Sequence, residues 1–245
     1  IELRMNRSRS LSRVHAPSPW IRMLTRALSW SWPRFQLCFD TPLEHMVETE
    51  VQQPALVATS LAMLAALHER GVKADFVIGH SVGEFAALAA AEAMSHEEAI
   101  TLVRERGLAM AEAAARNPGS MAAILGLEDE AVETLCRKIL GVWPANYNCP
   151  GQIVVSGEHL AVDECIERAQ EEGARRVVKL KVSGAFHSPL VAAAAERLRP
   201  ALDRVKFAEP TAPFMSTVTA KIEPAQRLGK LLVDQLTEPV RFTQS

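Results

Sequence analysis

The stretch that decides the fold is Asp75-Phe76-Val77-Ile78-Gly79-His80-Ser81-Val82-Gly83-Glu84-Phe85-Ala86-Ala87-Leu88. A short apolar run enters a Gly-x-Ser-x-Gly turn and leaves as an alanine-rich helix, which is typical of a nucleophile elbow with Ser81 at its apex. Gly79 and Gly83 lack side chains where the strand and helix backbones are expected to crowd, so Ser81 can occupy a strained turn. Backbone N–H groups at the start of the helix then face a reacting carbonyl oxygen. The alternative is a glycine-rich turn that merely contains a serine.

The composition predicts an ordinary globular chain. Its 245 residues are 48% hydrophobic and 23% charged, with a net charge of −2. Without a long basic stripe there is no reason to expect nucleic acid or an anionic membrane as a partner, and no run of 18 apolar residues predicts a membrane span. The cysteines show neither disulfide nor zinc spacing, so we expect free thiols in a reducing cytoplasm and no metal. We also expect a monomer. They are Cys38, Cys136, Cys149 and Cys165.

Residues 1–41 form an atypical head. They contain seven arginines and three of the four tryptophans, with only Glu2 and Asp40 acidic. A transit peptide has such a bias, but the tryptophans and the lack of a clean amphipathic period argue against one. We expect this head to be poorly ordered or not native to the protein.

The first predicted lobe consists of helices around the elbow. A helix is expected over residues 52–70 with Pro54 in its first turn, and another over residues 82–93. Ser95 and Glu98 then form an S-x-x-E capping box for a helix that reaches about Ala114.

A second lobe follows with the order β-α-β-β-α-β, which is the ferredoxin-like order. We therefore predict an α/β protein with two lobes. The large, α/β-hydrolase-like lobe has a mostly parallel sheet and is formed by residues 42–118 and 188–245. The small ferredoxin-like lobe, residues 119–187, is inserted into it.

A nucleophilic serine requires an imidazole within hydrogen-bond reach. Of the seven histidines, His187 is the best candidate, because it follows the last strand of the small lobe in a loop that can return over the elbow. His80 adjoins Ser81, but successive side chains at a strand end diverge, so His80 is expected to line the site rather than act as the base. The other five are expected at the surface or outside the site.

No acid is placed to complete a Ser-Asp/Glu-His triad. The acids between Ser81 and His187 fall on helices or helix starts. An amide or a backbone carbonyl is expected to orient the imidazole instead, and Gln235 is the candidate. Alternatively, Gln235 is a solvated glutamine at a helix end.

Arg106 lies on the apolar face of the helix predicted over residues 95–114. An inward guanidinium needs an anion, because leaving it unpaired costs several kcal/mol. The anion is either an internal carboxylate or, since this helix packs beside the elbow, a substrate carboxylate near Ser81. The second interpretation suggests an acyl group that itself ends in a carboxylate.

Together these residues resemble the malonyl-CoA:acyl carrier protein transacylases and the acyltransferase domains of polyketide synthases. The matching segments are QQPAL at 52–56, GHSVGE at 79–84, VRERG at 103–107, NYNCPGQIVVSG at 146–157, GAFHSPL at 184–190 and QLTEPVRF at 235–242. The resemblance covers about residues 42–245 and is specific because several motifs match in order.

The resemblance implies transfer of a malonyl group from coenzyme A to an acyl carrier protein, with a coenzyme A thioester as substrate and no bound cofactor. It implies a role for each matching residue: Ser81 as acylated nucleophile, His187 as base, Arg106 and Gln53 as acyl-binding residues, Val82 as oxyanion donor, Gln235 as the group that orients His187, and Phe186 as the residue that disfavours an α-methyl. The basic strand at residues 175–181 is either a carrier-protein contact or a solvated face.

The chain departs from the family pattern at both ends. Relatives begin with a strand and a Gly-Gln-Gly loop that supplies the second oxyanion donor, and residues 1–41 contain neither. The chain also ends at Ser245, before the closing strand and helix that the family leads us to expect. Two alternatives therefore stay open: a serine esterase or thioesterase, and a catalytically impaired fragment that binds a carrier protein.

Overall fold

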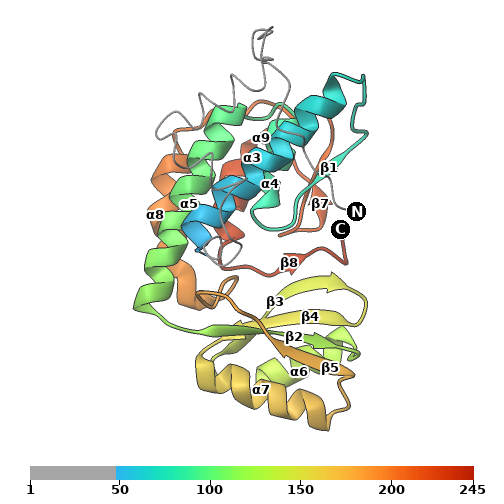
Figure 1. Cartoon of the computed structure of the whole chain (residues 1–245), viewed down its shortest axis with the longest axis vertical. Coiled ribbons are helices and arrows are strands. Elements are labelled where there is room, and N and C mark those ends of the chain that lie inside the picture. Colours follow the sequence, from blue (N-terminus) through green and yellow to red (C-terminus); the bar gives the residue numbers. More distant parts are fainter. Residues whose placement is uncertain (1–47) are drawn as a thin grey trace, which may run out of the picture.

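The computed structural model describes residues 48–245. Two lobes follow one another along the long axis of the molecule (Figure 1). In the upper lobe of this view helices pack around a small sheet, and in the lower lobe a larger sheet carries two helices on its outer side. The atypical head at residues 1–41 lies outside the described residues, so its predicted order is not tested here.

The large lobe is mainly helical. Its helices are α3 (Thr49–His68), α4 (Gly83–Ala90), α5 (His96–Arg116), the 3-10 turn η2 (Pro189–Val191), α8 (Ala192–Leu202) and α9 (Ala225–Asp234). Its strands are β1 (Val77–Ile78), β6 (Phe214–Ser216) and β7 (Lys221–Ile222). In the described residues, β1 and β6 are parallel while β6 and β7 are antiparallel, so the parallel character expected of this sheet is carried by a single strand pair.

The starts of two helices test the predicted boundaries. The capping box of α5 is confirmed: Ser95 Oγ accepts a hydrogen bond from the Glu98 N–H at 3.1 Å, and Glu98 Oε2 accepts one from the Ser95 N–H at 2.8 Å. The prediction that Pro54 lies in the first turn is wrong, because α3 begins at Thr49 and Pro54 therefore lies inside the helix. Burial of Thr49 and Gln53 on the packed side of α3 extends this helix to the N-terminal side of the proline.

The small lobe has the predicted ferredoxin-like topology. Its elements are β2 (Ser120–Leu125), α6 (Asp129–Lys138), β3 (Val142–Cys149), β4 (Gln152–Gly157), α7 (His159–Glu171) and β5 (Arg176–Lys179). The strand order is β5-β2-β4-β3 with every neighbouring pair antiparallel. Successive side chains of β2 point to opposite faces of the sheet and so contribute to two separate clusters. Ala122 and Ile124 pack with α6 and α7, whereas Met121 and Ala123 form a second cluster with Phe186 on the opposite face.

A short strand from the end of the chain joins the lobes. Strand β8 (Val240–Arg241) pairs in parallel with β3, with Asn146 opposite Val240. In Figure 1 it runs between the two lobes. The Arg241 N–H also donates to the Thr217 carbonyl of the large lobe at 2.8 Å. This strand, which the sequence did not lead us to predict, fixes the segment that follows α9 against both lobes.

Within residues 48–245, no helix combines the length and the apolar character that a bilayer crossing requires.

Candidate active site

Ser81 sits on a strained turn between β1 and α4. Its φ is +53°, a left-handed conformation that is uncommon for a residue other than glycine. The turn is closed by a hydrogen bond from the Gly83 N–H to the His80 carbonyl at 3.0 Å and another from the Glu84 N–H to the Ser81 carbonyl at 3.0 Å. This strand-turn-helix geometry is that of a nucleophile elbow, as the Gly-x-Ser-x-Gly pattern predicts.

The two elbow glycines have different roles. A Cβ on Gly79 would lie 2.1 Å from the Gly83 carbonyl carbon, so the predicted crowding is confirmed at Gly79. A Cβ on Gly83 would meet no described atom within 4 Å beyond its chain neighbours and the backbone of its own helix, so the expectation that Gly83 lies at a crowded position is wrong. The crowding arises because the backbone of Gly83 itself packs onto the Cα of Gly79.

His187 completes a nucleophile-base pair with Ser81. Ser81 Oγ lies 2.8 Å from His187 Nε2, although the two residues are 106 positions apart in the chain. On the other side of the ring, Nδ1 lies 2.7 Å from the Gln235 carbonyl and 3.2 Å from the Glu238 carbonyl. Because carbonyls only accept, Nδ1 carries the proton, which leaves Nε2 free to accept the Ser81 hydroxyl proton.

Two backbone carbonyls thus occupy the position of a triad carboxylate. Gln235 contacts the imidazole through its main chain, and its side-chain amide is engaged elsewhere. Sequence alone left open whether an amide or a carbonyl makes this contact, because it does not show where the loop after α9 turns. The structure brings the loop carbonyls of residues 235 and 238 to the ring.

Burial keeps the base neutral. Desolvation of the His187 ring, followed by the positive charge of Arg106, lowers the pKa of His187 to about 3. Hydrogen bonds from Nδ1 to the carbonyls of Gln235 and Glu238 act in the opposite direction but are weaker. The imidazole therefore remains unprotonated at neutral pH and available as a base.

Arg106 is a buried guanidinium directly beside the serine. Its side chain is 1% exposed, and Nη2 donates to Ser81 Oγ at 3.0 Å. Nη1 donates to Gln53 Oε1 at 2.6 Å and Nη2 donates to Gln235 Oε1 at 3.1 Å. In the described part of the chain no carboxylate forms an ion pair with Arg106, and its buried Nε has no hydrogen-bond partner.

The neighbours of Arg106 therefore leave its positive charge available. Both glutamines offer neutral amide oxygens, which satisfy hydrogen bonds without cancelling the charge. Burial lowers the pKa of Arg106 to about 10, against the opposite effect of the Glu84 carboxylate, and Arg106 is still protonated at neutral pH. Of the two interpretations made from the sequence, an internal salt bridge is not found in the described residues. An anion-binding role fits the geometry.

The remaining predicted residues surround this centre. Among residues 48–245, the Val82 N–H at the start of α4 has no hydrogen-bond acceptor, so it is free to donate to an oxyanion. Phe186 is half-buried and packs against the cores of both lobes. His80 is exposed, with Nε2 2.8 Å from Asn148 Oδ1 and its ring 5.5 Å from that of Phe242.

Two residues of the site were missed by the sequence reasoning. Asn148, on β3, contacts His80 from the small lobe. Glu84, three residues after Ser81, is fully buried and accepts hydrogen bonds from both Thr217 and Gln235. Burial raises the pKa of Glu84 to about 7, against the hydrogen bonds from Thr217 and Ser216. A charged residue on the buried side of an alanine-rich helix was the signal that could have identified it.

The described residues hold no cluster of three or more histidine, cysteine or acidic side chains able to bind a metal ion.

Fold and site together define a serine-histidine acyl-transferring protein of the elbow type, and comparison with known proteins agrees. The acyl transferase domain family matches residues 29–245, and the chain belongs to this family. It is 42% identical over 214 residues to the malonyl CoA-acyl carrier protein transacylase of Bacillus subtilis (strain 168), which covers 85% of this chain and 68% of that protein. The chain spans about two thirds of the length of the curated relatives that it matches.

Solved structures give the same result. The crystal structure of MCAT from Streptococcus pneumoniae superposes with a TM-score of 0.84 at 39% identity, covering 91% of this chain and 73% of that one. A structure described as PlMCAT:AntF (holo), a type II PKS acyl-carrier protein in complex with its malonyl-transacylase, gives a TM-score of 0.85 at 35% identity over the same shares of the two chains. The predicted resemblance and the α/β fold class are therefore confirmed.

The elbow glycines provide a matched pair of substitutions. We expect Gly79→Ala to destabilise the protein by about 2 kcal/mol or more, because the new Cβ collides with backbone rather than with a mobile side chain. Gly83→Ala, in the first turn of α4, should change the free energy of unfolding by less than about 1 kcal/mol. Urea unfolding of both variants measures the free energy of unfolding. Equal decreases in the two variants would contradict the conclusion that only Gly79 is crowded.

The lowered pKa of His187 predicts the pH dependence of Ser81 acylation. With 4-nitrophenyl acetate as probe, we expect the acylation rate to stay level from pH 7.5 to pH 5, because the imidazole remains neutral over this range. An imidazole with the ordinary pKa would lose roughly 30-fold over the same range. Intact-mass time courses measure the rate, with Ser81→Ala as the control. An acid limb near pH 6.5 would show that the ring is solvated.

Proposed function

We propose that this protein is an acyltransferase that moves a malonyl group from coenzyme A to the phosphopantetheine thiol of an acyl carrier protein through an ester on Ser81. The observation that carries the proposal is the buried, charged Arg106 with Nη2 3.0 Å from Ser81 Oγ and no ion-pair partner in the described chain. A guanidinium at this distance fits an acyl group whose far end is a carboxylate.

In the first half-reaction, Ser81 Oγ attacks the thioester carbonyl carbon while its proton passes to His187 Nε2. The carbonyl oxygen becomes an oxyanion, to which the free Val82 N–H can donate a hydrogen bond. Collapse of the tetrahedral intermediate breaks the carbon–sulfur bond. The departing coenzyme A sulfur takes the proton from His187, which leaves malonyl-Ser81 and a neutral imidazole.

In the second half-reaction, the same base serves the carrier thiol. The phosphopantetheine thiol gives its proton to His187 Nε2 and its sulfur attacks the ester carbonyl. Cleavage of the ester bond returns the proton to Ser81 Oγ. Coenzyme A enters only as part of the substrate, so the proposed reaction requires no bound cofactor.

Selectivity rests on the charge of Arg106. Gln53 and Gln235 hold two of its nitrogens in fixed directions, so little conformational entropy remains to be lost when a carboxylate binds. An acyl group without a carboxylate would leave the guanidinium unpaired. Phe186, between the two cores, occupies the space that an α-methyl group on the substrate would need in this proposal.

An acidic carrier protein is the proposed macromolecular partner. The relative described as PlMCAT:AntF (holo) is a transacylase in complex with an acyl-carrier protein. Here the exposed basic side chains Arg175, Arg176 and Lys181 lie on or beside β5 of the small lobe, while Lys179 of the same strand is already paired with Asp163. We propose a cytoplasmic monomer that meets its carrier through surface charges of this kind.

Substitution of Arg106 tests the proposal directly. In Arg106→Ala we expect malonyl loading of Ser81 from malonyl-CoA to fall by about 100-fold or more, because a charge-assisted bidentate contact is lost. Acetyl loading from acetyl-CoA should be retained or raised. The matched control is Arg104→Ala, an exposed arginine on the same helix that should leave both rates unchanged. Intact-mass spectrometry of the acyl-enzyme measures both rates.

Two other outcomes would replace the proposal. Rapid release of the acyl group to water, with no effect of Arg106→Ala on loading, would indicate an esterase or thioesterase. The absence of any Ser81 adduct with malonyl-CoA, in protein that is folded by circular dichroism, would indicate a module that only binds a carrier protein.

A further inference from the structure

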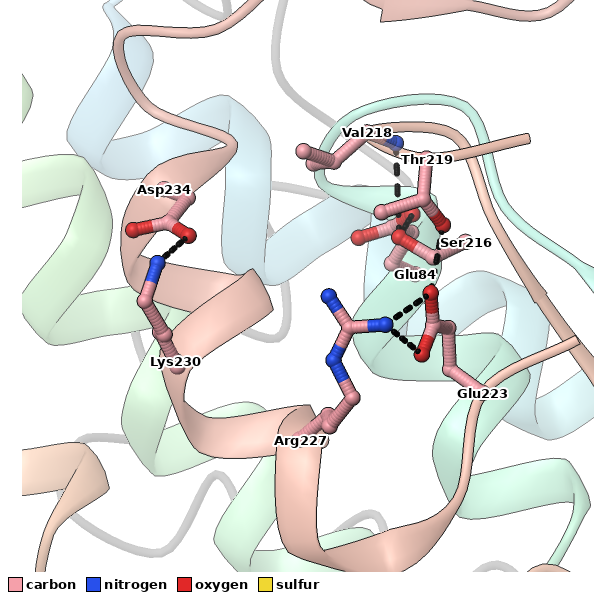
Figure 2. A network of polar contacts seen from close by, with 8 residues as sticks. All are labelled: Glu84, Ser216, Val218, Thr219, Glu223, Arg227, Lys230 and Asp234. Carbon is pink, nitrogen blue, oxygen red and sulfur yellow. Dashed lines mark hydrogen bonds and ion pairs between the residues drawn. The ribbon is translucent and has the colours of Figure 1, made fainter. Parts of the chain in front are cut away.

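Glu84 is a buried carboxylate that the proposed reaction does not use. It is 0% exposed and is the second residue of α4. Its Oε1 accepts from the Thr217 N–H at 2.7 Å, the Thr217 hydroxyl at 2.9 Å and the Ser216 hydroxyl at 3.3 Å. Figure 2 shows Glu84 beside Ser216, whose hydroxyl also accepts from the Val218 N–H. These contacts fix the carboxylate to the turn after β6.

The second oxygen of Glu84 reaches the active site. Oε2 accepts from Gln235 Nε2 at 2.8 Å. With its amino group donated to Glu84, Gln235 presents Oε1 to Arg106 Nη2 at 3.1 Å, and the same Nη2 donates to Ser81 Oγ at 3.0 Å. The hydrogen bonds therefore run without interruption from Glu84 to the nucleophile.

This chain of contacts has a fixed polarity. A primary amide has one accepting and one donating end, and a carboxylate can only accept. If Gln235 flipped, its oxygen would face the Glu84 carboxylate and its amino group would face the guanidinium, which are two repulsive contacts. The carboxylate of Glu84 therefore selects the amide orientation in which Arg106 finds an acceptor.

We propose that Glu84 is a positioning residue for substrate selection: it holds the Gln235 amide so that Arg106 is aimed at the distal carboxylate of the acyl group. The inference rests on the proposed function, since it assigns Arg106 to that carboxylate. It predicts that Glu84 affects loading of malonyl more than loading of acetyl, because acetyl has no carboxylate for Arg106 to bind.

The test is Glu84→Gln, assayed at pH 8. Glutamine has the same shape and can keep its oxygen on Thr217 and Ser216, but it then presents an amino group to Gln235. That amino group and Arg106 compete for the single Gln235 oxygen. We expect kcat/KM for malonyl loading to fall about tenfold or more, mainly through KM, and acetyl loading to change by less than about threefold.

The matched control is Thr217→Val. It removes one hydrogen bond from Glu84 Oε1 and leaves the contact between Oε2 and Gln235 intact. If Glu84 only holds the turn after β6, Thr217→Val should change the loading of Ser81 in the same way as Glu84→Gln. If Glu84 positions Gln235, Thr217→Val should leave the ratio of malonyl to acetyl loading unchanged. Thermal unfolding of each variant shows that the protein compared is folded.

Coupling gives the second readout. If Glu84 acts through Gln235, then Glu84→Gln should cost nothing further in a Gln235→Leu background, which keeps the carbonyl that contacts His187. Should Glu84→Gln not fold, Glu84→Asp replaces it, because the shorter carboxylate held by Thr217 cannot also reach Gln235. The same selective loss is then expected.

The outcomes separate the two proposals. A native chain that forms no malonyl adduct refutes the proposed function. The positioning role is refuted, and the proposed function is kept, if the native chain loads malonyl and the folded Glu84 variants load malonyl and acetyl as the native chain does. The same conclusion follows if these variants lose malonyl and acetyl loading equally.

Discussion

The structure depends on one buried positive charge that no direct ion pair neutralises within residues 48–245, where the Glu84 carboxylate acts on it from beyond the Gln235 amide. Arg106 is fully enclosed, yet its nearest hydrogen-bond partners are the neutral oxygens of Gln53, Gln235 and Ser81. Burying a guanidinium without a paired anion costs free energy. A carboxylate that binds beside Ser81 would therefore be stabilised by Arg106. The same charge helps to keep His187 unprotonated. In the proposed reaction, one residue thus contributes both to selecting the acyl group and to keeping the base neutral.

Five segments of the chain are needed to build this arrangement. The elbow supplies Ser81 and the Val82 N–H, α3 supplies Gln53 and α5 supplies Arg106. The chain returning from the small lobe supplies His187, and the loop after α9 supplies the carbonyls that fix the tautomer of its ring. Strand β8 explains why that loop is held in place, because it pairs with the small lobe immediately after the loop. Figure 1 shows β8 between the two lobes, and the contact of His80 with Asn148 joins the lobes beside Ser81.

Local patterns predicted much of this, and long-range contacts account for the rest. The elbow, the capping box at Ser95 and the inward Arg106 follow from spacings within one element, where backbone geometry leaves few choices. The ferredoxin-like order follows from the sequence of elements. Strand β8 and the contact between Asn148 and His80 could not be predicted, because two-residue strands and cross-lobe pairs have no periodic signature. The prediction for Gly83 was wrong because an added side chain would collide with the backbone only on the Gly79 side of the turn.

The most direct measurement is a crystal structure of the protein trapped with malonate esterified to Ser81. Our account predicts that both oxygens of the distal carboxylate lie within hydrogen-bond distance of the Arg106 guanidinium, with the ester carbonyl oxygen at the Val82 N–H and His187 Nε2 facing the ester. A distal carboxylate directed into solvent, with Arg106 still bound only to Gln53 and Gln235, would contradict it.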